Sequence, residues 1–187
     1  MAEEPGQVRD TELDAEAQAR RRLALAQIRQ YPDPVLRMQA RPVDAFDGDL
    51  RRLVERMTAL MKDAQGIGLA ATQVGVLRRL FVFQPEEDRV AAVVNPRLVV
   101  IGDERETDDE GCLSLQGVSV PVERARAVRL EGLDEHGREL RLELEELPAR
   151  AAQHELDHLD GVLILDRTTD EARREALATL RPQPSLA

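Results

Sequence analysis

Two of the three histidines in this 187-residue chain, His154 and His158, stand four residues apart with Glu155 between them. In an α-helix, residues i and i+4 lie one turn apart on the same face, so both imidazoles can reach one point. Three histidines rarely fall into this pattern by chance, which makes two surface histidines on an acidic helix the weaker interpretation. The pattern predicts a helix that supplies two ligands to one metal ion, with a glutamate placed to act as general base.

Apolar spacing and helix-end signals predict three helices along the chain, the histidine helix among them. They cover residues 50–61, with Asp47 or Asp49 as the cap and Gly66 at the end; the histidine helix, from Pro148 to Gly161; and a last helix capped by Thr168 or Thr169, with Ala172, Ala176, Leu177 and Leu180 inward and Pro182 at its end.

Between the first and second of these helices the pattern favours strands. Residues 128–144 alternate apolar and charged side chains on either side of a turn that contains His136, which predicts a β-hairpin and a solvated histidine. We expect the acidic run 103–109 to be a solvated loop. Other strand-like runs lie at residues 80–83, 91–94 and 98–101. The order predicts an α+β fold, with antiparallel β-sheets packed around a central helix that carries the metal-binding histidines, and a C-terminal helix.

The length suits one ordinary domain. Residues 1–25 have few apolar anchors, so we expect an N-terminal extension that is loosely ordered or helical, followed by a single catalytic domain over residues 26–187. No apolar run approaches the ~20 residues that span a bilayer. Residues 1–5 lack the features of a signal peptide, so we expect a cytoplasmic protein without membrane attachment. The net charge of −10 argues against specific nucleic-acid binding.

A hydrolytic metal site needs three protein ligands and one open position for water. No histidine follows His158, so the third ligand is either Cys112, the only cysteine, or a carboxylate. A metal ion would deprotonate the thiol of Cys112, although a lone cysteine is more often a small buried hydrophobic residue. The downstream carboxylates are those of Asp160, Asp166, Asp170, Glu171 and Glu175. The residues alone leave this choice open.

Three segments together resemble the motifs of one enzyme family. Residues 66–73 (GIGLAATQ), 110–114 (EGCLS) and 153–158 (QHELDH) are similar to the three signature motifs of peptide deformylases, in the family's order and with family-like spacing. Residues 31–37 (YPDPVLR) also resemble the family's N-terminal stretch, and the similarity spans residues 28–168. The resemblance implies a metal-dependent hydrolase that removes the formyl group from N-formylmethionine at the N-terminus of newly made polypeptides and releases formate.

By this resemblance, Cys112, His154 and His158 bind the metal and leave its fourth position to water. The metal lowers the pKa of that water, and Glu155 takes the proton as the water attacks the formyl carbon. Glu155 then delivers the proton to the departing amine.

The resemblance also implies how the substrate is bound. The side-chain amide of Gln73 and the backbone N–H of Leu113 would stabilise the oxyanion, where a fixed donor is typically worth about 3–4 kcal/mol. Gly66 and Gly68 would let the substrate backbone approach and pair like an added strand. A loop-capping amide is the structural alternative for Gln73, as is a helix stop for the glycines. The methionine pocket would be lined by Ile67, Glu110, Gly111, Leu113 and Leu115.

The ligand set suits several metals. Two imidazoles and a thiolate can bind Zn²⁺, Fe²⁺, Ni²⁺ or Co²⁺, and the resemblance implies one Fe²⁺ per chain, with the others as substitutes. The implied partners are N-formylmethionyl nascent peptides, and we expect a monomer. Arg173, Arg174 and Arg181 could make a transient ribosome contact, as C-terminal helices of some relatives do, although a plain solvated face is the favoured interpretation.

Two other functions compete with deformylation. A zinc metallopeptidase could use the same His-Glu-x-x-His helix with an acidic third ligand such as Glu171, and a catalytically silent module could use the metal only for stability. Replacing Cys112 by Ala should remove the metal from a deformylase and spare it in a peptidase. Replacing Glu155 by Gln should abolish turnover only if Glu155 is the base.

Overall fold

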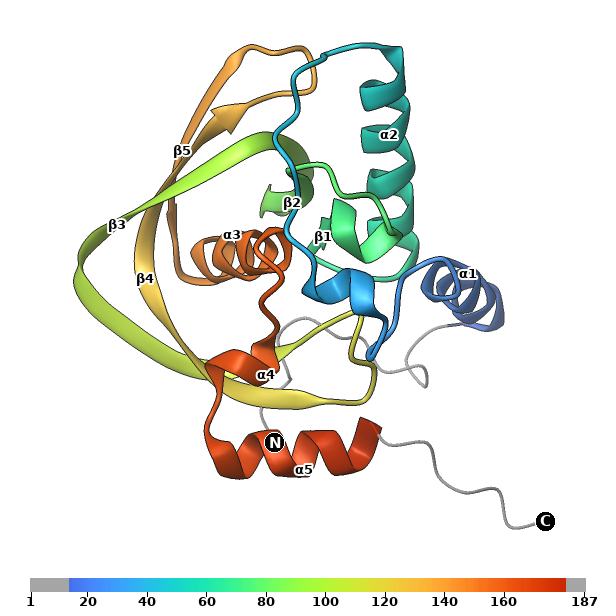
Figure 1. Cartoon of the computed structure of the whole chain (residues 1–187), viewed down its shortest axis with the longest axis vertical. Helices are drawn as coiled ribbons and strands as arrows, with labels where there is room; N and C mark the ends of the chain where they lie inside the picture. The colour runs from blue at the N-terminus through green and yellow to red at the C-terminus, as the bar shows by residue number, and fades with distance from the viewer. Residues whose placement is uncertain (1–13, 181–187) are drawn as a thin grey trace.

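The computed structural model describes residues 14–180, which form one five-stranded antiparallel sheet, helices and short 3-10 turns (Figure 1). The helices are α1 (Ala15–Leu25), α2 (Gly48–Asp63), α3 (Glu146–Leu159), α4 (Ile164–Arg167) and α5 (Asp170–Leu180). The strands are β1 (Gly68–Ala70), β2 (Leu80–Glu86), β3 (Arg89–Gly111), β4 (Ser119–Leu133) and β5 (Glu139–Glu145), and the 3-10 turns are η2 (Pro34–Arg37) and η3 (Ala71–Val74).

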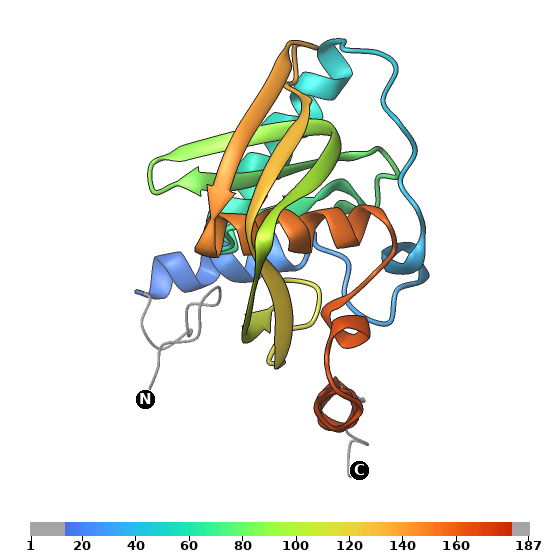
Figure 2. The same cartoon turned by 90° about the vertical axis from the view of Figure 1, so that its left-hand side faces the viewer.

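The sheet has the order β1-β2-β3-β4-β5 and curves around α3, which lies at the centre of the molecule (Figures 1 and 2). Strand β2 is buried on both faces: Leu80 and Val82 pack with α1 and α2, whereas Phe81 and Phe83 pack with α3. Burial on both faces explains why residues 80–83 are apolar without alternation. The predicted α+β fold with a central histidine helix is confirmed, with a single sheet around it.

Strand β3 is much longer than its predicted pieces. The runs 91–94 and 98–101 belong to this one strand, and the loop predicted at residues 103–109 was wrong. From Arg105 to Gly111 every residue pairs with β4, after a register shift that follows Ile101. Within residues 14–180 this half of β3 pairs only with β4, and its charged side chains are exposed up to Asp109, so the apolar alternation that usually marks a strand is missing.

The helices begin and end close to the predicted positions. Helix α2 is capped by the carboxylate of Asp47, but the residue with positive φ after it is Gln65 (φ 60°), not Gly66. Thr169 caps α5 through the N–H of Ala172. The predicted hairpin is β4–β5, with His136 exposed in its turn. The predicted helix end at Pro182 lies outside the described residues, as does Arg181.

Over residues 15–25 the expected N-terminal extension is helix α1. Ala24 and Leu25 at its end are buried in the same hydrophobic cluster as α2, so this last turn is packed against the domain. The division of the chain at residue 25 stays a prediction.

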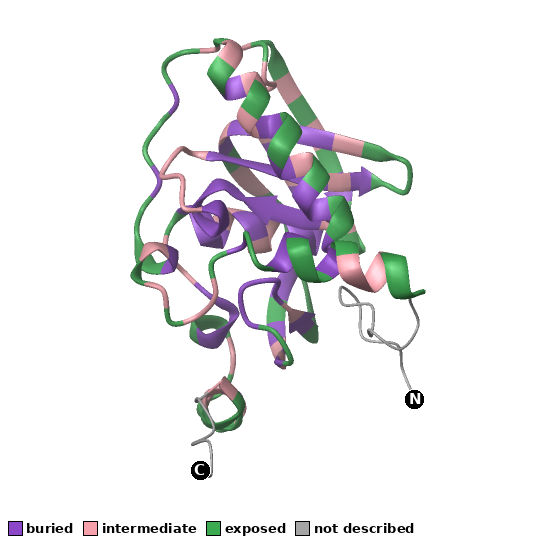
Figure 3. Cartoon of the chain, turned by 90° about the vertical axis from the view of Figure 1, so that its right-hand side faces the viewer, coloured by how far each residue is buried: buried purple, intermediate pink, exposed green. Residues whose placement is uncertain are grey.

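Buried residues gather between α2, the sheet and α3, while α5 exposes most of its surface (Figure 3). A separate hydrophobic cluster under α4 and α5 contains Cys112, Leu115, Leu163 and Ile164. Among residues 14–180, no helix combines the length and the apolar character needed to cross a membrane.

Candidate metal centre and its pocket

Cys112, His154 and His158 converge on one point in the described part of the chain. Their ligand atoms all lie within 4.8 Å of one another. The Nε2 atom of His158 is 3.3 Å from Cys112 Sγ and 3.2 Å from His154 Nε2. The histidines come from α3, and the cysteine directly follows β3. Among residues 14–180, no downstream carboxylate joins this cluster. Of the candidate third ligands, the structure therefore favours the thiol of Cys112 over a carboxylate.

The ring of His154 is oriented by a buried carboxylate. Its Nδ1 lies 3.0 Å from Glu110 Oε2. Arg124 donates to both oxygens of Glu110 at 2.9 and 3.0 Å, and Arg150 donates to Oε1 at 2.9 Å. Burial opposes ionisation of Glu110, but the hydrogen bonds from His154 and Arg124 outweigh it and lower its pKa. An ionised carboxylate only accepts, so Nδ1 of His154 is the donor and Nε2 faces the cluster.

The pKa values of the two imidazoles are shifted in opposite directions. Burial acts to lower the pKa of His154, but hydrogen bonds to Cys112 and Glu110 raise it well above its usual value. Burial, and then repulsion from His154 and Arg124, holds the pKa of His158 well below its usual value. A cation at this point would compete with the His154 proton, because a ligating imidazole must be neutral.

Glu155 lies beside the cluster and is almost fully buried, at 4% exposed. Burial raises its pKa to about 7, although the neighbouring charge of His154 opposes this. Its Oε2 atom has no hydrogen-bond partner among the described residues. The carboxylate fits because Gly68 has no side chain: a Cβ there would lie 2.7 Å from Glu155 Cδ.

The side-chain amide of Gln73 has a fixed orientation. Its Oε1 accepts the N–H of Ala70 at 2.8 Å, so Nε2 must point the other way. That nitrogen lies 3.1 Å from Ser114 Oγ and 3.7 Å from Cys112 Sγ. The N–H of Ser114 also approaches the sulfur, at 3.4 Å. Two N–H groups therefore lie within hydrogen-bonding distance of the sulfur.

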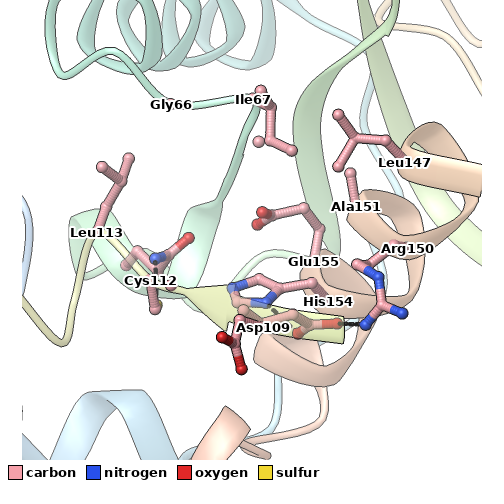
Figure 4. A pocket seen from close by; sticks show the side chains of 14 residues that line it. Gly66, Ile67, Asp109, Cys112, Leu113, Leu147, Arg150, Ala151, His154 and Glu155 are labelled. Atoms are coloured by element: carbon pink, nitrogen blue, oxygen red, sulfur yellow. Dashed lines mark hydrogen bonds and ion pairs between the residues drawn. The ribbon is translucent and has the colours of Figure 1, made fainter. Parts of the chain in front are cut away.

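One pocket opens onto the cluster and encloses about 510 Å³ of space, its open mouth included. Ile67, Leu147 and Ala151 form an apolar side above Glu155, and Leu113 lies on the opposite side (Figure 4). The sequence-predicted residues that line it are Gly66, Ile67, Gly68, Gln73, Glu110, Gly111, Cys112, Leu113, His154 and Glu155.

Leu115 was expected in the pocket but is not among the residues that line it. The chain turns after Cys112, where the N–H of Leu115 donates to the Cys112 carbonyl, and the Leu115 side chain is fully buried in the cluster with Leu36 and Leu163. Its place in the pocket wall was therefore predicted wrongly.

Three lining residues that the sequence interpretation missed lie on α3. Leu147, Arg150 and Ala151 precede His154 and Glu155 by three to eight residues, so they share the helix face that looks into the pocket. Helical spacing backward from the histidines would have found them. Arg124, by contrast, comes from β4, and no local pattern connects it with the site.

Comparisons with known proteins identify the family of this chain. The sequence model of the family described as polypeptide deformylase matches residues 25–174. The chain is 45% identical to a peptide deformylase of Acidothermus cellulolyticus over 159 residues, covering 85% of this chain and 87% of that protein. It is 46% identical to one of Clostridium botulinum over 147 residues, covering 79% and 99%. The chain belongs to the peptide deformylase family.

Solved deformylases share the fold as well. The structure of a peptide deformylase from Legionella pneumophila matches with a TM-score of 0.78 at 37% identity, covering 82% of this chain and 91% of the other. An Arabidopsis thaliana peptide deformylase 1B bound to an inhibitor matches with a TM-score of 0.78 at 41% identity, covering 82% and 89%. The chain is therefore a hydrolase of a metal-dependent family that removes the N-formyl group from newly made polypeptides.

Proposed function

We propose that Cys112, His154 and His158 hold one divalent metal, beside which Glu155 moves protons and Gln73 and Leu113 bind the formyl oxygen. The observation that carries this proposal is the convergence of one sulfur and two ring nitrogens within 4.8 Å, at the wall of a pocket that Glu155 also lines.

The donor set fits a metal. Three soft or borderline donors meet, and the hydrogen bond to Glu110 turns Nε2 of His154 toward the other two. We propose Fe²⁺ as the resident ion, because the resemblance to deformylases implies it, with Zn²⁺, Ni²⁺ or Co²⁺ as substitutes. When bound, such an ion supplies Lewis acidity, which polarises a carbonyl and makes water more acidic.

Glu155 is the proposed general base and acid. Its pKa of about 7 lies where a carboxylate can both accept a proton and return it near neutral pH. Oε2 is unpartnered in the described structure and can therefore take a proton from water. The same carboxyl group then protonates the amine that leaves when the C–N bond of the formamide breaks, and formate is released.

Gln73 and Leu113 are the proposed oxyanion donors. Oε1 of Gln73 is held by the backbone of Ala70, so Nε2 stays turned toward Cys112 and needs no reorganisation when charge develops. The side chain of Leu113 lines the pocket, and its backbone N–H follows directly after the sulfur ligand.

The pocket suits a methionine side chain at the N-terminus of a peptide. Ile67, Leu147 and Ala151 give it an apolar side (Figure 4). Glu110 and Gly111 also line it. Gly66 and Gly68 flank Ile67. Among residues 14–180, β1 pairs with a strand only on its β2 side, so an extended peptide could add to its other edge.

We further propose that the enzyme works in the cytoplasm as a monomer on N-formylmethionyl nascent peptides, without specific nucleic-acid binding. A transient ribosome contact would involve Arg173 and Arg174 on α5. Arg174 is exposed, whereas Arg173 is half-buried and donates to the carbonyl of Leu165, so Arg174 is the better test of that contact.

The test is Glu155→Gln, made and assayed without oxygen. The variant should keep one metal per chain and its thermal stability, yet lose formate release by at least about a hundredfold, the lower range for a removed acid–base group. Cys112→Ala is the companion variant and should lose the metal itself. Formate release at the wild-type rate by Glu155→Gln would refute the base assignment, and a full metal complement in Cys112→Ala would refute the ligand set.

A further inference from the structure

A row of alternating charges runs from the exposed end of α4 to the proposed ligand His154. It begins at Arg167, which donates to Asp157 through Nε at 3.0 Å and Nη2 at 2.6 Å. Asp157 also accepts Nη1 of Arg124 at 2.6 Å. Arg124 uses its other two donor groups on Glu110, which in turn accepts from His154.

We propose that Arg167 is a positioning residue for the metal centre: through Asp157, Arg124 and Glu110 it fixes the ring of His154. Docking of the C-terminal segment would then set the geometry of the ligand cluster. This inference rests on the proposed function, since it takes His154 as a ligand, and it adds a role for a residue outside the pocket.

The hydrogen bonds of Arg124 explain how Arg167 can affect the ring of His154. A guanidinium is planar with donors fixed in a fork, so bonds at both ends of Arg124 define the plane of the group. One end meets both oxygens of Glu110, and the other meets a single oxygen of Asp157. The position of the Asp157 carboxylate therefore determines the orientation of the Arg124 guanidinium relative to Glu110.

Arg167 is what holds the Asp157 carboxylate in place. Its fork contacts both oxygens, whereas Arg124 contacts one. Without Arg167, the Asp157 side chain, only 12% exposed, keeps Arg124 as its one remaining ion-pair partner in the described structure. The carboxylate would then compete with Glu110 for that guanidinium, and the anchor of His154 would loosen.

The position of Arg167 does not depend on Asp157 alone. It is the last residue of α4, where Ile164 and Leu165 are buried. Arg167 itself is 48% exposed, so truncating its side chain opens no cavity in the core. A change at Arg167 should act through its charge and its hydrogen bonds.

The experiment measures metal binding, using Co²⁺ alone as probe on the full-length apoprotein. Outer-shell partners of ligating histidines are typically worth 10–100-fold in metal affinity, and Arg167 lies further out, so Arg167→Ala should weaken Co²⁺ binding by about tenfold. The visible absorption of bound Co²⁺ should also change, because the ring of His154 turns. Arg167→Lys keeps the charge but loses the fork and should restore part of the affinity.

Arg37→Ala is the matched control. Arg37 pairs with Asp166, the neighbour of Arg167 on α4, but makes no ion pair with Asp157 in the described structure. If Arg167→Ala acted only by loosening α4, Arg37→Ala would weaken Co²⁺ binding equally, and that result would overturn the inference. Unfolding of each apoprotein in urea shows whether the two variants disturb the fold to the same extent.

A double-mutant cycle tests the route. In a Glu110→Gln background, and separately in Asp157→Asn, adding Arg167→Ala should change Co²⁺ affinity by less than about twofold, because the chain is already broken. Fully additive effects would overturn the inference. If Cys112→Ala loses Co²⁺ but Arg167→Ala binds it with wild-type affinity, the proposed metal site stands and only the role of Arg167 is overturned. Retention of Co²⁺ in Cys112→Ala overturns the proposed metal site, and the inference with it.

Discussion

His154 and His158 belong to one helix and face one point, yet they are held in opposite ways. His154 is anchored by charge: its Nδ1 meets Glu110, which two arginines surround. His158 makes no such contact. Its Nδ1 is buried without a hydrogen-bond partner among the described residues, and its position follows from the backbone around it.

The backbone around His158 is fixed by another part of the chain. The His158 carbonyl accepts the hydroxyl of Thr72 at 3.2 Å, and the next carbonyl, of Leu159, accepts the N–H of Ala40 at 2.8 Å. Gly161 then turns the chain with φ 73°, close to the backbone of Arg37. One ligand is thus oriented by electrostatics and the other by packing, so different substitutions should disturb them.

Glu110→Gln should have the largest effect, because it breaks the charge anchor of His154. Removing one partner of a buried ion pair leaves the other charge uncompensated, so the free energy of unfolding should fall by about 3–5 kcal/mol. Metal affinity should fall about 10–100-fold, as expected for a carboxylate behind a ligating histidine. Urea unfolding of the apoprotein and Co²⁺ titration measure the two effects.

Glu104→Gln is the matched control for this prediction, since Glu104 pairs with Arg126 on the surface. An exposed pair is worth less than about 1 kcal/mol, so the control should unfold nearly as the wild type does. Equal losses of stability in both variants would mean that the buried network gives His154 no special support.

Gly161→Ala should have the next largest effect, because it disturbs the helix end that carries His158. A Cβ at Gly161 would lie 2.5 Å from the carbonyl oxygen of Arg37, and the residue has positive φ. Gly102→Ala measures the cost of positive φ without the steric clash, since Gly102 has φ 70° and open space around it. Gly102→Ala should cost about 1–2 kcal/mol of unfolding free energy, and Gly161→Ala about 1–3 kcal/mol more, from overpacking.

Co²⁺ titration separates the two glycine variants further. Only Gly161→Ala should weaken metal binding, because only that change moves the end of α3. Wild-type Co²⁺ affinity in a folded Gly161→Ala protein would show that packing at the helix end does not position His158.

The contrast between the two histidines also shows what the sequence could predict. Helical spacing alone put His154 and His158 on one face, and the resemblance to deformylases brought Cys112 to them. The anchor of His154 was not foreseen beyond Glu110 as a pocket residue. Tertiary packing of β4, α3 and α4 brings together Arg124, Asp157 and Arg167, and a contact of this kind cannot be predicted from local periodicity in the sequence.

The errors in the predictions from the sequence have a similar origin. Residues 103–109 are all charged except Thr107, and charged runs usually indicate loops. They form a strand because β4 supplies hydrogen-bond partners while water solvates their side chains. Leu115 was placed in the pocket by analogy, but the turn after Cys112 sends it into the core. In both cases a distant part of the chain decided the outcome.

The smallest expected effect concerns the ion pair of Asp166 with Arg37, which joins the packed region near His158 to α4. Burial acts to raise the pKa of Asp166, but hydrogen bonds from Arg37 and from the N–H of Leu163 outweigh it and lower the pKa. A carboxyl group whose pKa is lower in the folded state stabilises the fold above its unfolded pKa, about 3.9. That contribution disappears as the pH falls through the lowered value.

Asp166→Asn cannot titrate, so the stability difference between it and the wild type should be largest near neutral pH and shrink below about pH 4. The difference should be small, since the Asp166 side chain is 41% exposed and solvent screens the pair. Urea midpoints of both proteins across this range measure it, and the same comparison in an Arg37→Ala background should show a weaker pH dependence. A difference that grows as the pH falls would mean that the pKa of Asp166 is raised in the folded protein, and that burial outweighs Arg37.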